Sequence, residues 1–208
     1  CKKTMINNHH VAAVCVYPPF VTTAKESLAN DAVRVATVAN FPAGTGSLED
    51  VQALILQSIA DGADEIDVVF PYQQYLRGEK AEAFEFVRAC KLTCGENVLL
   101  KVILETGALQ DAETIAEVSY NVCHAGADFL KTSTGKISVG ATPEAARAML
   151  GVLKKIPRPI GFKVSGGVRT IDQAQQYISI AKEMMGEHWV TPKNFRIGAS
   201  QLVDVLRG

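Results

Sequence analysis

Residues 126–134 read GADFLKTST, a short apolar run that leads into a polar loop and carries Lys131 in its middle. Residues 62–70 read GADEIDVVF and begin with the same Gly-Ala-Asp, so the two segments align as copies of one unit. In this alignment Asp67 and Lys131 occupy the same place, three residues after the shared aspartate. We therefore predict that these two side chains lie at equal depth and point the same way in a fold built from repeated strands.

Strand-like runs of this kind recur at a nearly constant interval along the chain. They begin at residues 12, 33, 65, 98, 128, 159 and 195, and after the first gap the spacing is about 32 residues. Helical patterns lie between them, and those with clear N-terminal caps start at Ser47, Thr142 and Thr170. Strands that alternate with helices through short connections predict parallel βα units.

The regular period favours a closed barrel of βα units over a doubly wound open sheet, which stays the alternative. A (β/α)8 barrel needs eight strands, and only seven are visible. The first ten residues, CKKTMINNHH, resemble the tail of a helix followed by a loop. We therefore predict an α/β protein with one domain over residues 1–208, a (β/α)8 TIM barrel whose first strand is missing from this chain.

Composition limits the class of protein. The chain has 208 residues, 48% of them hydrophobic, and its 21 basic and 22 acidic residues leave a net charge of −1. This balance argues against a nucleic acid or a membrane surface as partner, and no apolar run approaches the roughly 18 residues of a spanning helix. The five cysteines are scattered, which predicts free thiols in a reducing, cytoplasmic compartment.

Two further strand-like runs also carry a lysine, Lys101 in VLLKVILET and Lys163 in PIGFKVSGG. A sheet edge or a wet rim is the ordinary explanation for a lysine in a strand. A closed barrel has no edges and its outside is covered by helices, so these side chains have to point inward or reach the rim. Lys131 and Lys163 precede loops at the carboxyl ends of neighbouring strands, where barrel enzymes have their active sites.

When two ammonium groups lie close together in a site with little water, each makes the charged form of the other less favourable. Burial and a like charge lower the pKa of a lysine by up to about 3 to 5 units, and the neutral amine can attack a carbonyl and form a Schiff base. Asp67, at the same depth as Lys131, can move protons in the later steps. For Lys101 two interpretations stay open, a place in this charge network or a structural ion pair with Glu105 or an aspartate.

Glycine-bearing loops follow the last strands, at SGGVRT (165–170) and GAS (198–200). Their backbone N–H groups can approach an anion closely, and the helix that begins at Thr170 points its positive end toward the same place. Barrel enzymes frequently bind phosphate with these loops. The sequence therefore predicts a phosphate site, with candidates Gly135, Lys136, Gly166 and Gly167.

Six segments resemble the deoxyribose-phosphate aldolase family: GADEIDVVFPY, NVLLKVILETG, GADFLKTSTGK, ATPEAAR, GFKVSGGVRT and FRIGAS. The resemblance extends over essentially the whole chain, and KTSTGK followed by GFK-x-x-GGVRT is quite specific to the family. It implies a (β/α)8 enzyme that reversibly cleaves 2-deoxy-D-ribose 5-phosphate to D-glyceraldehyde 3-phosphate and acetaldehyde without a metal or other cofactor. The alternative is a truncated or non-catalytic barrel that binds phosphorylated sugars.

The resemblance also implies roles for single residues. Lys131 matches the Schiff-base lysine, Lys163 the neighbour that lowers its pKa, and Asp67 the proton-transfer acid. Substrate and phosphate contacts are implied for Cys15, Thr134, Gly135, Lys136, Gly166, Gly167, Gly198 and Ser200. Simple core packing is the alternative for Cys15.

The chain departs from the family in two places. Nothing in it matches the aspartate-bearing first strand, and Gln201 stands where the family commonly has a second serine. The partners implied are a phosphorylated sugar and an aldehyde, with no nucleic acid and no membrane, and a homo-oligomer is left open.

Overall fold

The computed structural model describes residues 5–6, 9–29 and 32–206. Seven parallel strands, hydrogen-bonded in chain order, form one sheet. They are β3 (Ala13–Val16), β4 (Arg34–Ala39), β5 (Glu65–Val69), β6 (Leu99–Ile103), β7 (Phe129–Lys131), β8 (Gly161–Ser165) and β9 (Phe195–Gly198). Within the described residues β3 and β9 do not pair with each other, so the sheet stays open between them.

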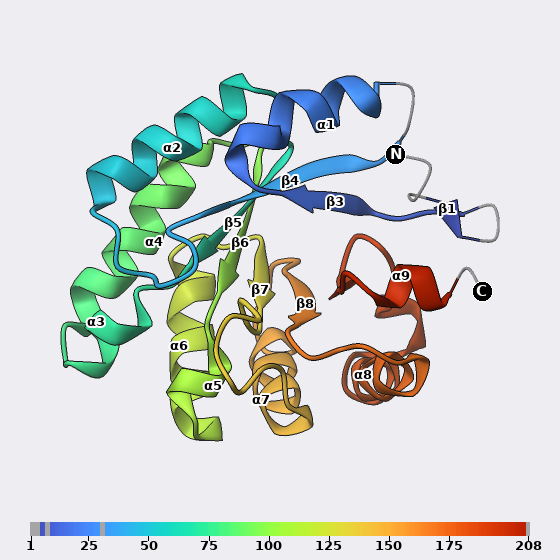
Figure 1. The fold of residues 1–208 in the computed structure, drawn as a ribbon. Coiled ribbons are helices and arrows are strands. Elements are labelled where there is room, and N and C mark those ends of the chain that lie inside the picture. Colours follow the sequence, from blue (N-terminus) through green and yellow to red (C-terminus); the bar gives the residue numbers. More distant parts are fainter. Residues whose placement is uncertain (1–4, 7–8, 30–31, 207–208) are drawn as a thin grey trace.

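The sheet curls, and helices lie along its outer side (Figure 1). Each of the seven predicted strands is present, and the order of pairing follows the chain without a reversal, unlike a doubly wound sheet. The arrangement is that of a (β/α)8 barrel without its first strand. The predicted fold class is confirmed.

The helices in the described part of the chain are α1 (Val21–Ser27), α2 (Leu48–Ala60), α3 (Tyr72–Leu76), α4 (Lys80–Cys94), α5 (Thr106–Leu109), α6 (Ala112–His124), α7 (Pro143–Leu153), α8 (Ile171–Met185) and α9 (Leu202–Val205), with 3-10 turns η2 (Pro18–Phe20) and η3 (Glu187–Trp189). Three of the helices, α2, α7 and α8, begin directly after the caps predicted from the sequence. The side chains of Ser47 and Thr142 accept backbone N–H groups of the first turns of α2 and α7. Thr170 forms a full capping box with Gln173 at the start of α8.

The beginning of the chain differs from the prediction. Met5–Ile6 (β1) and His9–His10 (β2) form a short antiparallel pair, so the expected helix tail is wrong for these residues, because cross-strand pairing requires extended backbone. Residues 1–4 and 7–8 lie outside the described part of the chain.

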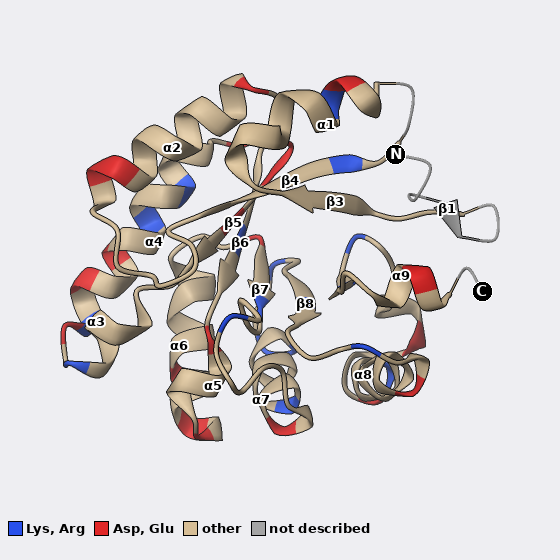
Figure 2. Ribbon diagram, viewed as in Figure 1, with Lys and Arg blue, Asp and Glu red and all other residues tan. Residues whose placement is uncertain are grey.

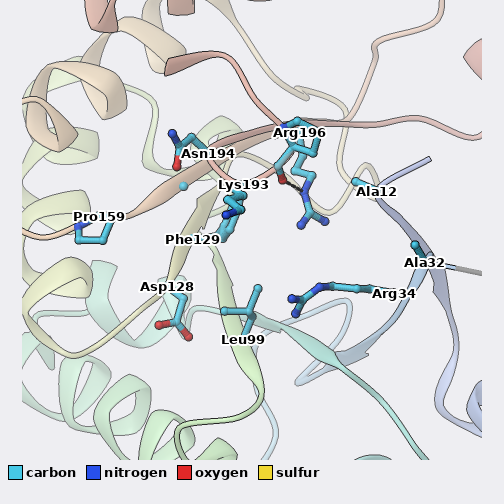
Figure 3. Close-up of a pocket in the computed structure, with 12 residues that line it drawn as sticks. Ala12, Ala32, Arg34, Leu99, Asp128, Phe129, Pro159, Lys193, Asn194 and Arg196 are labelled. Carbon is cyan, nitrogen blue, oxygen red and sulfur yellow. Dashed lines mark hydrogen bonds between the residues drawn. The ribbon is translucent and has the colours of Figure 1, made fainter. Parts of the chain in front are cut away.

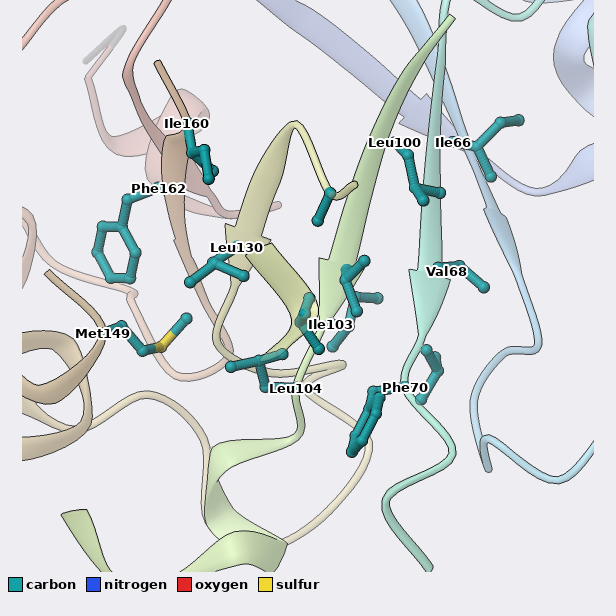
Figure 4. Close-up of a cluster of buried hydrophobic side chains, with 14 of the residues drawn as sticks. Ile66, Val68, Phe70, Leu100, Ile103, Leu104, Leu130, Met149, Ile160 and Phe162 are labelled. Atoms are coloured by element: carbon teal, nitrogen blue, oxygen red, sulfur yellow. The ribbon is translucent and has the colours of Figure 1, made fainter. Parts of the chain in front are cut away.

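The apolar core lies between the sheet and the helices. Ile66 and Val68 on β5, Leu100 on β6 and Leu130 on β7 are fully buried there, together with Met149 of α7 (Figure 4). Burial of each such side chain contributes about 1.5 to 3 kcal/mol to stability. Because side chains alternate across a strand, this layer stabilises the fold and leaves the inner face of the sheet to other residues. None of the helices within the described ranges is long and apolar enough to cross a membrane.

Candidate active site

The carboxylate of Asp67 lies at the centre of the inner face and accepts hydrogen bonds from three lysines. Lys101 Nζ donates to Oδ1 at 2.7 Å, and Lys131 Nζ and Lys163 Nζ each donate to Oδ2 at 2.8 Å. Asp67 is fully buried, and Lys131 and Lys163 are only 6% and 8% exposed. Figure 2 shows this charge on the inner strands around β5, β6 and β7, apart from the many charges on the helices.

The register of the strands produces this cluster. Asp67 pairs with Lys101 across β5 and β6, and Lys131 pairs with Lys163 across β7 and β8. β5 and β7 are alternate strands, whose inward side chains share a layer in a barrel. The hydrogen bond between Asp67 and Lys131 agrees with the prediction that the two side chains lie at equal depth and point to the same side of the sheet.

A second carboxylate, Glu65, extends the network toward the amino ends of the strands. Its side chain is fully buried, lies 2.6 Å from Lys101 Nζ and accepts hydrogen bonds of 3.2 and 3.3 Å from the guanidinium of Arg196. Lys101 thus belongs to the charge network and pairs with an aspartate, and its second partner is Glu65, not Glu105. Sequence reasoning missed Glu65 and Arg196, although Glu65 stands two residues before Asp67 and so faces the same side of β5.

The charges in this network push the pKa values of the two neighbouring lysines apart. Burial lowers the pKa of Lys131, and the positive charge of Lys163 lowers it further against the opposing effect of Asp67. Burial also acts against the charge on Lys163, but the negative charge of Asp67, with smaller contributions from other groups, outweighs it and raises the pKa of Lys163. For Asp67 burial would raise the pKa, yet the three ammonium groups hold it well below its ordinary value.

The balance of charge in the site explains which group loses a proton most readily. Five basic side chains form ion pairs with the two carboxylates, so the site holds an excess of positive charge. Loss of one proton relieves this excess at the least cost, and Lys131 is the lysine whose pKa is lowered. The arrangement can therefore supply a neutral amine beside an ammonium and an ionised carboxylate.

Cys15 lies on β3, within electrostatic reach of Asp67 and Lys163. As a residue it is exposed, yet the protein around its thiol removes enough water to raise the pKa, and the charge of Asp67 adds to this effect. A thiol with a raised pKa is mostly protonated and a weak nucleophile. The structure places Cys15 at the edge of the lysine cluster rather than in the apolar core.

The loops after β7 and β8 lie against each other, which brings the predicted phosphate glycines together. The backbone of Gly166 has φ +87°, and a Cβ there would lie 3.0 Å from the Cβ of Ser133 and 3.4 Å from the Cα of Gly135. Ala141 N donates to Gly166 O at 2.9 Å, which joins the loops. The positive φ and these close contacts together favour glycine at residue 166.

The other residues predicted to contact the substrate or its phosphate differ in their surroundings. Gly198 on β9 adjoins Lys163, since a Cβ on this glycine would lie 3.0 Å from the lysine Cε. Lys136, Gly167 and Ser200 are exposed. Thr134 uses its hydroxyl within the protein, because Oγ1 accepts a hydrogen bond from Lys136 N at 3.0 Å and donates to the carboxylate of Glu105. Sequence reasoning did not identify this use of Glu105.

A cavity of about 470 Å³ opens at the opposite end of the sheet. Arg34 and Arg196 point into it from opposite sides, beside Phe129 (Figure 3). Its lining includes Leu99 and Gly161, the first residues of β6 and β8, so it lies at the amino ends of the strands. In barrel enzymes chemistry is carried out at the carboxyl ends, and the candidate site is accordingly the cluster around Lys131.

A curled sheet of parallel βα units, with buried lysines and an aspartate gathered on its inner face, is the architecture of a barrel enzyme. The family model for DeoC/LacD family aldolases matches residues 3–202. The chain belongs to this family.

Solved structures agree with this assignment. The chain is 30% identical to a protein from Coccidioides immitis that carries the provisional name deoxyribose-phosphate aldolase, with a TM-score of 0.82 over 95% of this chain and 74% of that one. A protein from Toxoplasma gondii ME49 with the same provisional name is 27% identical, with a TM-score of 0.87 over 100% of this chain and 84% of that one. Deoxyribose phosphate aldolase from Aeropyrum pernix, described as a unique tetramer, is 25% identical, with a TM-score of 0.74 over 92% of this chain and 74% of that one.

Proposed function

We propose that this aldolase reversibly cleaves 2-deoxy-D-ribose 5-phosphate to D-glyceraldehyde 3-phosphate and acetaldehyde through a Schiff base on Lys131. The observation that carries the proposal is the shared oxygen of Asp67, to which Lys131 and Lys163 both donate at 2.8 Å. Burial lowers the pKa of Lys131, while Asp67 raises the pKa of Lys163 against the effect of its burial. Schiff-base formation requires an uncharged amine, and burial beside a second ammonium group favours that form.

The reaction follows from this arrangement. The neutral Nζ of Lys131 attacks the C1 aldehyde of the open-chain sugar, and loss of water leaves an iminium ion. The C2–C3 bond then breaks, its electron pair moves toward the iminium to form an enamine, and the C3 hydroxyl loses its proton as glyceraldehyde 3-phosphate departs. Protonation of the enamine at C2 and hydrolysis of the imine release acetaldehyde and restore Lys131.

Asp67 and Lys163 have different roles in the remaining steps, proton transfer and charge stabilisation. Because its pKa is held well below the ordinary value by the three ammonium groups despite burial, Asp67 is a carboxylate in the free site and acts first as a proton acceptor. Any proton that it returns has to come from an ammonium or from water. Lys163, with a raised pKa, keeps its charge near Lys131 and stabilises the electron-rich intermediate.

The substrate phosphate is proposed to bind at the joined loops after β7 and β8. Gly135 and Gly166 lie in contact there, Gly167 is exposed, and Lys136 supplies a cation. The 15-residue helix α8 begins at Ile171, directly after the second loop, and its positive end favours an anion. Assembly into a homo-oligomer stays a proposal, in line with the tetrameric relative from Aeropyrum pernix.

Borohydride trapping tests the proposal. The protein is incubated with acetaldehyde and sodium borohydride, and the reduced adduct is located by peptide mapping. We expect a two-carbon adduct on Lys131, lost in Lys131→Met and retained in Lys155→Met, whose side chain is exposed. An adduct confined to exposed lysines would refute the mechanism. Protection against unfolding by the sugar phosphate without any adduct would instead support the non-catalytic, phosphate-sugar-binding alternative.

A further inference from the structure

Glu105, the second residue after β6, has a carboxylate with an unusual environment. The residue is fully buried, and in the part of the chain that the structure describes its side chain forms no ion pair. Its partner is Thr134, which donates its backbone N–H at 3.3 and 3.4 Å to the two carboxylate oxygens and its hydroxyl to one of them. A buried carboxylate without a cation reduces stability unless hydrogen bonds compensate for the lost water.

The backbone of the same residue is also strained. Glu105 has φ 56° and ψ 60°, in the left-handed region that residues other than glycine rarely occupy. Its carbonyl oxygen accepts a hydrogen bond from Ala108 N at 2.9 Å, so the left-handed turn starts α5. Two unfavourable features at one residue, at the carboxyl end of a strand beside Lys131, indicate a functional demand on its position.

The hydrogen bonds of Glu105 continue into the proposed phosphate site. Thr134 Oγ1, which donates to Glu105, also accepts a hydrogen bond from Lys136 N at 3.0 Å. The chain of contacts from Glu105 through Thr134 to Lys136 therefore constrains the backbone on both sides of Gly135. The phosphate is proposed to be bound by this backbone.

The rest of the loop after β7, residues 132–142, is tightly packed. If the contact between Glu105 and Thr134 is lost, the whole loop therefore cannot shift to compensate. A Cβ at Gly107 of α5 would lie 2.2 Å from Val139 O, and a Cβ at Gly140 would lie 2.3 Å from Gly166 O. The loop is thus held between α5 and the loop after β8. Within it, residues 134–136 depend on Glu105 for their conformation.

We propose that Glu105 is a positioning residue that holds residues 134–136 in the phosphate-binding conformation and thereby determines the preference for phosphorylated over unphosphorylated substrates. This inference rests on the proposed function. It deepens that function by assigning the preference to a buried carboxylate that does not itself contact the substrate.

The test compares 2-deoxyribose 5-phosphate with 2-deoxyribose as substrates. In Glu105→Gln we expect the ratio of their kcat/KM values to fall about tenfold, mainly through a higher KM for the phosphorylated sugar, because one hydrogen bond to a charged group is lost. Thr134→Val should lower the ratio similarly, and Thr134→Ser, which keeps the hydroxyl, should restore it. Glu96→Gln is the matched control, because Glu96 is exposed in a turn.

A double variant shows whether the two residues act through each other. Glu105→Gln with Thr134→Val should lower the ratio by less than the product of the two single effects, since both weaken the same contact. Equal losses on the two substrates, an unchanged ratio, or additive effects would each overturn the inference. If Glu105→Gln does not fold, Thr134→Val and Thr134→Ser decide the question by themselves.

Borohydride trapping of the unchanged protein separates this inference from the proposed function. A protein with an adduct on Lys131 whose Glu105 and Thr134 variants keep the full preference for phosphate contradicts the role of Glu105 alone. A protein without an adduct on Lys131 contradicts the proposed function, and the inference with it.

Discussion

The unequal lysines around Asp67 show how far identical side chains can differ when their surroundings differ. Lys131 and Lys163 are neighbours across β7 and β8 and share one carboxylate oxygen. The pKa of Lys131 is lowered by burial and by Lys163, whereas that of Lys163 is raised by Asp67 against the effect of burial. A pair of titratable groups pushed apart in this way indicates which one is the nucleophile.

Removal of Lys163 tests this division. In Lys163→Met the positive neighbour is gone and Asp67 pairs more fully with Lys131, so both effects raise the pKa of Lys131. The rising limb of kcat/KM against pH should move to higher pH, and activity at neutral pH should fall about tenfold for each pH unit that the limb moves. Lys155→Met, at an exposed residue, should leave the profile in place. Movement of the limb to lower pH would contradict the charge argument.

Asp67 links the same cluster to stability in acid. Its pKa is held well below the ordinary value by the three lysines, which outweigh burial, so its contribution to the free energy of unfolding is complete above its unfolded pKa of about 3.9. That contribution is lost as the pH falls from there through the lower folded pKa. Urea unfolding should therefore show Asp67→Asn to be about 3 to 5 kcal/mol less stable at neutral pH, with the difference shrinking below about pH 4. A constant difference across this range would refute the linkage.

At the scale of elements, the proposed phosphate site depends on the loops that follow the strands rather than on the strands. The loops after β7 and β8 meet because glycines stand at their contacts, and the backbone of Gly166 combines a positive φ with close neighbours. Gly186, after α8, has a similar φ of +93° but nothing within 4 Å of the place of a Cβ. The two glycines therefore separate backbone strain from crowding.

Alanine at each of these glycines should give different results. Gly186→Ala is expected to cost about 1 to 3 kcal/mol of unfolding free energy from the backbone conformation alone, because φ 93° and ψ 154° lie in a region that is almost confined to glycine. Gly166→Ala should cost more and should also weaken binding of inorganic phosphate, because the added methyl group would press on Ser133 and Gly135 in the loop after β7. Urea unfolding and calorimetric titration with phosphate measure the two effects. Equal costs, with phosphate binding unchanged, would show that the contact between the loops is unimportant.

At the scale of the whole molecule, the central strands of the sheet are stabilised by more neighbours than the two strands at its edges. β5, β6 and β7 each have a hydrogen-bonded strand on both sides, whereas β3 pairs only with β4 and β9 only with β8 among the described residues. The apolar layer drawn in Figure 4 also lies over the central strands. Local opening should therefore begin at these edges.

Amide hydrogen exchange can test this gradient. We expect β5, β6 and β7 to exchange last, and β3 and β9 to exchange at least tenfold faster under native conditions, because strands with one neighbour open at a lower free-energy cost. The capped helices α2, α7 and α8 provide an internal comparison, since their ends are closed by Ser47, Thr142 and Thr170. Uniform protection across the sheet would show that β3 and β9 are supported as well as the central strands.

Local signals in the sequence were enough for the strands, the capped helices and the shared depth of Asp67 and Lys131, because repeated units, caps and alternation act over a few residues. They failed at Met5–Ile6 and His9–His10, which pair as antiparallel strands instead of forming the end of a helix. The single domain over residues 1–208 and the roles of the site residues stay predictions.

The sequence by itself determined the order of the βα units, the inward direction of Asp67 and its lysines, and the glycines of the two loops, since each depends on periodicity or on backbone conformation. Only the tertiary structure decided that Glu65 and Arg196 join Lys101 and that Thr134 donates its hydrogen bonds to Glu105. These outcomes depend on distances and burial among residues far apart in the chain, which no local pattern encodes.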